Sequence, residues 1–246
     1  MPELLASVAS LEEAALALEL GADILDLKQP RSGALGAWPL DQVAEAVAQF
    51  GGRRPISATI GDVPLLPVCV VPAVEATCST GVDYVKIGFF AGGDAHVCLA
   101  ALEPQAARTR LVAVLMADQG LDLGLLPFLA GAGFAGAMLD TADKRAGSLR
   151  AHRSDATLAG FVATARLNGL LSGLAGSLGL ADIPALAALG PDYLGFRGAL
   201  CGQGRESALA PTAFAAVRDA LDTAQPARAS NATATAGAQR PTSAAA

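Results

Sequence analysis

The sequence contains few charged residues, few aromatic residues and no strongly basic segment. Charged side chains make up 16% of its 246 residues, aromatic side chains make up 4%, and the formal net charge is −6. A nucleic-acid-binding surface needs a basic face, so this balance predicts no nucleic-acid partner. No amphipathic stretch rich in lysine and arginine predicts binding to a membrane surface.

Long apolar runs are also absent, although hydrophobic residues make up 52% of the chain. The longest uncharged run, residues 123–139, is interrupted by Pro127 and by four glycines. Because a transmembrane helix needs about 20 mainly apolar residues, we expect no membrane span. The N-terminal residues include Glu3 and no basic region before an apolar stretch, which predicts no secretory signal peptide.

Cysteine and histidine are scarce as well. The four cysteines form no Cys-x-x-Cys pair, and a chain of this size does not depend on disulfide bonds, so we expect reduced thiols in a cytoplasmic protein. The two histidines, His96 and His152, have no second ligand type at metal-binding spacing, and no metal site is predicted. We also predict no cofactor, because no glycine-rich dinucleotide fingerprint follows the first apolar run.

What the chain does contain is an alternation of short apolar runs with Ala- and Leu-rich stretches of helical spacing. Eight runs of strand length cover residues 4–8, 24–28, 56–60, 84–89, 111–116, 136–141, 170–176 and 193–198. Eight strands, each followed by a helix, predict an α/β domain that forms a single (β/α)₈ TIM barrel over residues 1–224. An open doubly wound sheet is the alternative. Residues 225–246 are rich in Ala, Thr, Ser and Pro, which predicts a disordered tail.

Several polar side chains stand where an element begins or ends. Ser10 and Glu13 form a capping-box signature at the start of the first predicted helix. Asp62 follows the third predicted strand and Asp118 follows the fifth. Each of these two aspartates is interpreted either as a turn cap or as an active-site acid.

Only three of the 17 basic residues are lysines, namely Lys28, Lys86 and Lys144. Arginine neither deprotonates nor forms imines in proteins, so the remaining lysines are candidates for amine chemistry. Asp26 and Lys28 share one face of the second predicted strand, because residues i and i+2 of a strand point the same way. This charged pair is expected in the barrel interior near the C-terminal rim, where barrel enzymes place their chemistry.

Lys86 lies between apolar neighbours in the fourth predicted strand, where a buried ammonium is costly unless it is paired or neutralised. Asp140 ends the sixth predicted strand, and Lys144 can reach it across a short turn. The three amines are expected to converge on one mouth of the barrel. We predict a Schiff base at Lys28 and proton transfer by Lys86, and spacing alone leaves the reverse assignment open. Salt bridges that only fix the barrel packing are the structural alternative.

Small residues end the seventh and eighth predicted strands, where barrels frequently bind phosphate. Gly176 and Ser177 follow one strand and Gly198 follows the other, so backbone amides can approach an anion there. Arg197 adds a guanidinium fork suited to phosphate. These four residues are the predicted phosphate-binding residues.

The segment 26–37 contains the pattern D-x-K-x-P followed by G-x-L-G-A. This pattern resembles a signature of the (5-formylfuran-3-yl)methyl phosphate synthase family of methanofuran biosynthesis. Further blocks resemble the family in the same order, at residues 57–64, 83–88, 138–141 and 197–199. The resemblance extends over roughly residues 4–205. It implies a barrel lyase that condenses two molecules of glyceraldehyde 3-phosphate and releases phosphate and water.

The resemblance also implies roles for individual residues. Lys28 resembles the Schiff-base lysine of the family and Lys86 its proton acceptor, while Asp26, Asp140 and Lys144 resemble supporting residues. The implied partner is a small phosphorylated aldehyde, and the apolar barrel helices favour a homo-oligomer. The alternatives are another Schiff-base aldolase without dehydration, an acid–base decarboxylase or epimerase without an imine, and a non-catalytic phosphometabolite sensor.

Overall fold

The computed structural model describes residues 1–224, in which strands and helices alternate along the chain. The strands are β1 (Glu3–Val8), β2 (Ile24–Leu27), β3 (Ile56–Thr59), β4 (Tyr84–Phe89), β5 (Arg110–Met116), β6 (Gly136–Asp140), β7 (Leu171–Leu174) and β8 (Tyr193–Phe196). The α-helices are α1 (Leu11–Glu19), α2 (Leu40–Phe50), α3 (Pro67–Cys78), α4 (Ala95–Ala106), α5 (Leu126–Gly131), α6 (Leu149–His152), α7 (Asp155–Leu167), α8 (Ile183–Ala188) and α9 (Pro211–Thr223). Short 3₁₀ turns are η1 (Pro30–Ser32), η2 (Leu123–Leu125), η3 (Leu180–Asp182) and η4 (Gly198–Leu200).

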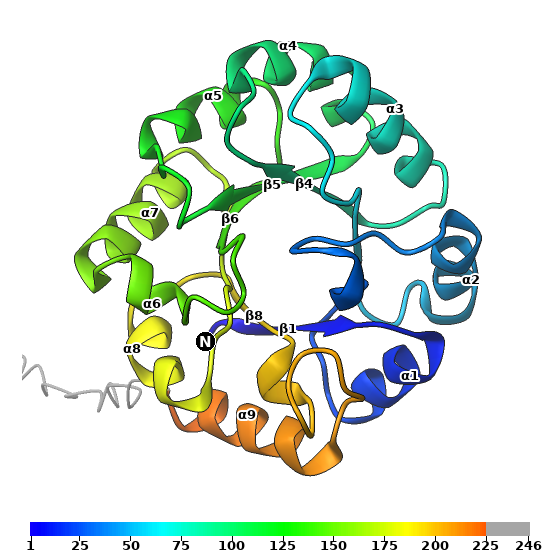
Figure 1. Ribbon diagram of the computed structural model, residues 1–246, viewed down its shortest axis with the longest axis vertical. Coiled ribbons are helices and arrows are strands. Elements are labelled where there is room, and N and C mark those ends of the chain that lie inside the picture. Colours follow the sequence, from blue (N-terminus) through cyan, green and yellow to red (C-terminus); the bar gives the residue numbers. More distant parts are fainter. Residues whose placement is uncertain (225–246) are drawn as a thin grey trace, which may run out of the picture.

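The eight strands form one closed parallel barrel in sequence order. Closure is made by β1 and β8, which pair in parallel with Leu5 opposite Gly195. Figure 1 shows the helices as an outer ring around the strands. The (β/α)₈ TIM barrel is therefore confirmed, and the open doubly wound sheet is excluded. The predicted tail, residues 225–246, lies outside the described residues.

Each predicted apolar run overlaps one observed strand, but β1 and β5 begin one residue earlier than predicted and several strands end earlier. β2 ends at Leu27, β7 at Leu174 and β8 at Phe196. Lys28 keeps one hydrogen bond of the strand ladder, which its amide donates to the Val8 carbonyl at 3.0 Å. The difference matters for function, because it places Lys28 at the start of a rim loop rather than inside the ladder.

The barrel has two apolar layers with different contents. The larger layer lies between the strands and the helices and contains side chains such as Leu25, Leu27 and Val85. The smaller layer fills part of the barrel interior and contains Leu5 and Met138. The interior also buries charged and hydroxyl side chains from the same strands, so its apolar packing is interrupted where the polar groups meet. The buried polar residues include Ser7, Asp26, Lys28, Ser57, Thr59, Lys86, Asp140 and Arg197.

Two rim aspartates hold the loops next to them. Both oxygens of Asp62 accept backbone N–H bonds, from Ala34 and Leu35, at 2.7 Å each. Gly33 precedes these residues with φ +119°, and a Cβ there would lie 2.1 Å from the Asp62 carboxylate, so the close approach requires glycine. Asp118 likewise accepts two backbone N–H bonds from the loop after β6, at 2.8 Å each. Both aspartates therefore cap backbone, as one of their two interpretations predicted.

Only one of the two hydrogen bonds of the predicted capping box is formed at the first helix. The Ser10 hydroxyl accepts the Glu13 amide at 3.3 Å. The Glu13 carboxylate accepts the Ala9 amide at 2.7 Å, one residue earlier than a capping box requires, and it also accepts hydrogen bonds from Arg197. The position of Glu13 beside β8 explains the difference, because the carboxylate is shared with a distant cation. Within residues 1–224, no helix is long and apolar enough to cross a membrane.

Candidate active site

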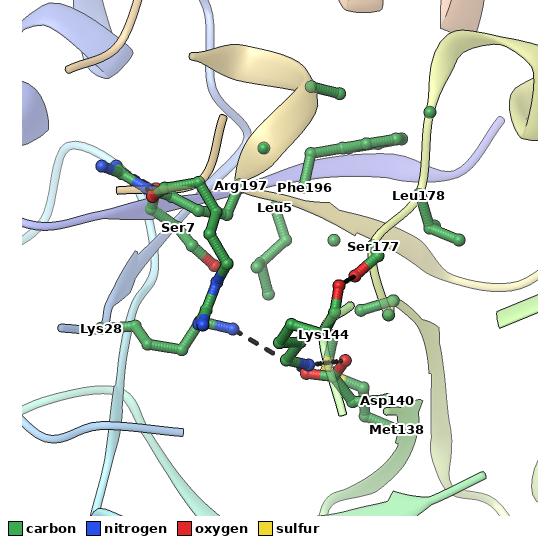
Figure 2. A pocket seen from close by; sticks show the side chains of 17 residues that line it. Leu5, Ser7, Lys28, Met138, Asp140, Lys144, Ser177, Leu178, Phe196 and Arg197 are labelled. Atoms are coloured by element: carbon green, nitrogen blue, oxygen red, sulfur yellow. Dashed lines mark hydrogen bonds and ion pairs between the residues drawn. The ribbon is translucent and has the colours of Figure 1, made fainter. Parts of the chain in front are cut away.

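A cluster of three charged side chains, Lys28, Asp140 and Lys144, lies at the C-terminal rim of the barrel; we call it the rim cluster. The Lys28 Nζ is 3.8 Å from Asp140 Oδ2, and the Lys144 Nζ donates a hydrogen bond to Asp140 Oδ1. All three side chains are almost completely buried, at 8%, 2% and 9% exposure. Figure 2 shows the two amines approaching the carboxylate from different elements. Two cations thus share one anion.

The rim cluster borders a cavity of about 300 Å³. The predicted phosphate-binding residues line the same cavity, which brings strands β1, β2, β6, β7 and β8 together at one site. Seven predicted site residues are in its wall: Lys28, Asp140, Lys144, Gly176, Ser177, Arg197 and Gly198. We call this space the imine cavity.

The other two predicted residues, Asp26 and Lys86, form a salt bridge inside the barrel; we call it the interior pair. Lys86 Nζ donates to Asp26 Oδ1 at 2.8 Å, and the hydroxyls of Ser7 and Ser57 donate to the same carboxylate at 2.8 and 2.7 Å. Burial alone would raise the pKa of Asp26, but the ammonium groups of Lys86 and Lys28 outweigh it and hold the pKa below its ordinary value. The carboxylate is therefore ionised and fully hydrogen-bonded.

The expectation that all three amines open on one mouth is wrong for Lys86. This residue is the third of the six residues of β4, and it pairs in register with Thr59 and Val112, below the strand ends. Its side chain borders a separate cavity of about 280 Å³, with Glu3 and Pro55 from the opposite end of the barrel. Lys86 is linked to the rim through Asp26, whose charge also acts on Lys28.

The amine of Lys28 has an unusual acidity for a lysine. Burial lowers its pKa from 10.5 to about 8; Asp140 opposes this change, and the ammonium of Lys144 adds to it. The pKa of Asp140 is itself held low, because two ammonium groups outweigh the effect of its burial. A lysine with its pKa lowered in this way carries the free, uncharged amine more readily near neutral pH than an ordinary lysine does.

In the loops after β7 and β8, three backbone N–H groups have no hydrogen-bond acceptor within residues 1–224. The amides of Gly176, Ser177 and Gly198 donate no hydrogen bond to any group within residues 1–224. Gly176 and Ser177 both have left-handed backbone conformations, at φ +101° and +48°. The Ser177 hydroxyl donates to the Lys144 carbonyl at 3.0 Å and so ties this loop to the rim cluster. Free amides on a fixed loop beside a cavity suit an anionic group.

The guanidinium of Arg197 is already fully hydrogen-bonded within the protein. Its five N–H groups donate to the carbonyls of Ser7, Arg205 and Ser207 and twice to the Glu13 carboxylate. It therefore fixes the loop after β8 against α1, although it borders the imine cavity. No local pattern indicates this arrangement, because Glu13 is 184 positions away along the chain.

A residue that the sequence analysis missed is Arg205, whose side chain also borders the imine cavity. Its guanidinium donates one hydrogen bond, to the Gly33 carbonyl at 3.1 Å, and forms no ion pair with any residue in the range 1–224. The only signal in the sequence was an arginine in a short Gly- and Ser-containing loop after the eighth strand.

The histidines form no metal site in the structure. His96 contacts Phe128 edge-on instead of a polar ligand. Among residues 1–224, no three His, Cys, Asp or Glu side chains are grouped to hold a metal ion.

Comparison with known proteins gives one family over nearly the whole barrel. The sequence pattern of a family described as 4-HFC-P synthase matches residues 4–218. A (5-formylfuran-3-yl)methyl phosphate synthase from Methanopyrus kandleri is 37% identical over 218 residues, covering 82% of this chain and 91% of that protein. A Methylorubrum extorquens protein that bears the same name provisionally is 46% identical over 200 residues, covering 81% and 83%.

Solved structures resemble this chain in fold. Phosphoribosyl anthranilate isomerase from Thermus thermophilus superposes with a TM-score of 0.61 at 15% identity, covering 92% of this chain and 100% of that one. The 3-keto-L-gulonate-6-phosphate decarboxylase from Vibrio cholerae gives a TM-score of 0.61 at 14% identity, covering 92% and 99%. At this low identity the similarity concerns the barrel alone.

Proposed function

The chain belongs to the 4-HFC-P synthase family, and we propose that it condenses two molecules of glyceraldehyde 3-phosphate into (5-formylfuran-3-yl)methyl phosphate. The reaction is of the lyase type and releases phosphate and water. The observation that carries the proposal is the buried Lys28 amine, whose pKa is lowered to about 8, at the edge of a cavity with free backbone amides. An amine of this kind forms imines with aldehydes near neutral pH.

The proposed first stage is imine formation on Lys28. The free amine attacks the aldehyde carbon of one triose, water leaves, and the resulting iminium withdraws electrons from the neighbouring C–H bond. The interior pair moves that proton, with the ionised Asp26 carboxylate as its acceptor and Lys86 hydrogen-bonded to that carboxylate, and an enamine is left. The enamine carbon then attacks the aldehyde of the second triose. Elimination of one phosphate and ring closure follow, with a net loss of two water molecules, and hydrolysis of the product imine restores the free Lys28 amine.

The remaining residues support this chemistry through charge and position. Asp140 holds the amines of Lys28 and Lys144 in place, while the charge of Lys144 keeps the pKa of Lys28 low. We propose that the amides of Gly176, Ser177 and Gly198 bind one substrate phosphate, and that Arg197 contributes to this site by fixing the loop that carries Gly198. The reaction needs no cofactor in this scheme.

The proposal extends to the cellular setting of the protein. The product would serve the biosynthesis of a methanofuran-type one-carbon carrier, as the names of the relatives and the resemblance of the sequence suggest. We further propose a cytoplasmic location and a homo-oligomer, in keeping with the acidic, disulfide-free composition and the apolar helices.

The test combines product detection with chemical trapping. The purified protein is incubated with glyceraldehyde 3-phosphate alone, and furan absorbance and released phosphate are followed. A second sample is reduced with borohydride and digested, and mass spectrometry locates the added triose. We expect a furan product and a reduced adduct on the peptide that contains Lys28. An adduct without furan would indicate an aldolase without dehydration, turnover without an adduct would indicate acid–base chemistry, and binding without either would indicate a sensor; each result contradicts the proposal.

A further inference from the structure

A second cavity of about 950 Å³ adjoins the imine cavity at the same rim. The walls of the two cavities have two residues in common, Lys144 and Arg205, and both are cations. The second cavity is otherwise formed by the loops after β2, β3, β4, β5, β6 and β8. It includes Gly33 and Ala34 on one side and Ala142 on the other.

We propose that this second cavity binds the second phosphorylated aldehyde and that the guanidinium of Arg205 is its phosphate anchor. The inference rests on the proposed function, because only a reaction that joins two phosphorylated substrates needs two phosphate sites at one rim. The free amides of the β7 and β8 loops serve the substrate that is bound to Lys28. The second substrate must present its aldehyde to the enamine from outside that position, and the common wall is where the two cavities meet.

Arg205 differs from its neighbour Arg197 in the property that matters for a ligand. All five N–H groups of Arg197 have protein partners, whereas only one hydrogen bond from the Arg205 guanidinium, to the Gly33 carbonyl, is formed within residues 1–224. Most of the Arg205 fork is thus available for the bidentate contact that guanidinium makes with phosphate. Burial lowers the pKa of Arg205, and the charges of Asp140, Glu206 and Asp62 oppose this change, although none of these carboxylates lies within ion-pair distance of the guanidinium.

The position of Arg205 is fixed by the groups around it. The backbone carbonyl of Arg205 accepts a hydrogen bond from the Nε–H of Arg197 at 2.8 Å. Arg197, whose N–H groups are all bonded, therefore orients the loop that carries Arg205. Its side chain is held against the β2 loop at Gly33, and Asp62 clamps the next two residues of that loop. A pre-positioned cation binds an anion without first losing conformational freedom.

Three carboxylates line the second cavity as well, and those of Glu206 and Asp62 act electrostatically on Arg205. Both oxygens of Asp62 are turned to backbone amides. Asp143 accepts the Arg145 amide and lies 3.9 Å from the Arg145 side chain. Glu206 borders the cavity without an ion pair in the described chain. Three cations and three carboxylates therefore line the space, and Arg205 is the cation that reaches the imine cavity from the β8 side with only one of its N–H groups bonded within residues 1–224.

The test separates imine formation from condensation. We compare Arg205→Gln, which removes the charge, and Arg205→Lys, which keeps the charge without the fork, with the wild type. For Arg205→Gln we expect the amount of borohydride-trapped triose on Lys28 to stay within about twofold of the wild type, because the first substrate does not need this anchor. We expect the rate of furan formation at low substrate to fall about 100-fold, mainly through a raised KM, since charge-assisted bonds to phosphate are lost. At low substrate, Arg205→Lys should form furan about tenfold faster than Arg205→Gln, because it keeps the charge.

The control is Arg108→Gln, which removes an exposed arginine just before β5, at the opposite end of the barrel, and should leave both measurements unchanged. Thermal melting confirms that each variant is folded, and Arg205→Lys provides a folded comparison if Arg205→Gln unfolds. Furan formation by Arg205→Gln at the wild-type rate would overturn the inference, as would a parallel loss of trapped imine and furan. A wild type that forms no furan would instead refute the proposed function.

Discussion

The interior pair and the rim cluster are made of the same residue types, but their charges are balanced differently. In the interior pair one ammonium faces one carboxylate, and two serine hydroxyls complete the hydrogen bonding of Asp26. In the rim cluster two ammonium groups share the single carboxylate of Asp140. Both groups are buried, so burial alone does not distinguish them.

Under the proposed function, the uneven charge balance of the rim cluster is what activates Lys28 as the nucleophile. A buried cation with an anion of its own is stabilised in its charged form. A buried cation that shares its anion with a second cation is not fully compensated, and the pKa of Lys28 falls to about 8. Removing or redistributing single charges in the two groups tests this view, and the expected effects differ widely in size.

The largest effect is expected from Lys28→Arg, which keeps a cation in the rim cluster but removes the amine. Arginine cannot form an imine, so turnover should fall on the order of 10⁴-fold or more. Furan absorbance gives the rate, and mass spectrometry after borohydride reduction gives the adduct. Lys144→Arg is the matched control, because it alters a second amine of the same cluster and should retain the trapped imine. A full-stoichiometry adduct in Lys28→Arg would refute the assignment.

The next largest effect concerns stability and the interior pair. Asp26→Leu leaves the Lys86 ammonium buried without its partner, which should lower the free energy of unfolding by about 3–5 kcal/mol. The double variant Asp26→Leu/Lys86→Met should recover most of this loss while remaining inactive. Urea unfolding measures both. Asp155→Ala breaks a surface pair with Arg150, which water screens, and should therefore cost far less stability. Equal losses in the interior and surface variants would show that burial of the pair is not decisive.

These two groups also show what the sequence could predict. Strand alternation placed Asp26 and Lys28 on the inward face, and the i, i+4 spacing brought Asp140 and Lys144 together; the structure confirms both. Alternation gives the face of a strand but not the level along the barrel axis. That level depends on the register between strands, such as Thr59 opposite Lys86, which no local pattern encodes. The depth of Lys86 was therefore mispredicted.

The loop after β8 shows the second limit of the sequence. Arg197 had the residue type and strand position of a phosphate ligand, but its guanidinium is satisfied by Glu13 and by backbone carbonyls. No local sequence feature marks Arg205 as a phosphate ligand. Which of two arginines stays free depends on contacts between segments almost 200 residues apart, and these exist only once the barrel has closed.

A smaller effect is the pH dependence of stability caused by Lys28. Its pKa is about 8 in the folded protein and 10.5 as an ordinary lysine, so between these values the unfolded chain binds more protons. The contribution of Lys28 to stability therefore rises with pH from about 8 to 10.5, and below pH 8 the charged amine costs a constant amount of about 3 kcal/mol. We expect Lys28→Met to be the more stable protein at pH 7 and to lose this advantage by pH 10.5. A gap that does not change with pH, measured by urea unfolding, would contradict the lowered pKa.

The smallest expected effect is the most specific, because it predicts two opposite shifts. Lys144→Gln removes the like charge that lowers the pKa of Lys28, and Asp140→Asn removes the carboxylate that raises it. The midpoint of imine formation, near pH 8 in the wild type, should move up in Lys144→Gln and down in Asp140→Asn, each by roughly one pH unit. Single-turnover trapping rates across pH 6–10 measure the midpoint. Arg145→Gln removes an exposed cation of the same loop and should shift it far less. Shifts in the same direction for both cluster variants would mean that packing, and not the sharing of one anion by two amines, sets the acidity of Lys28.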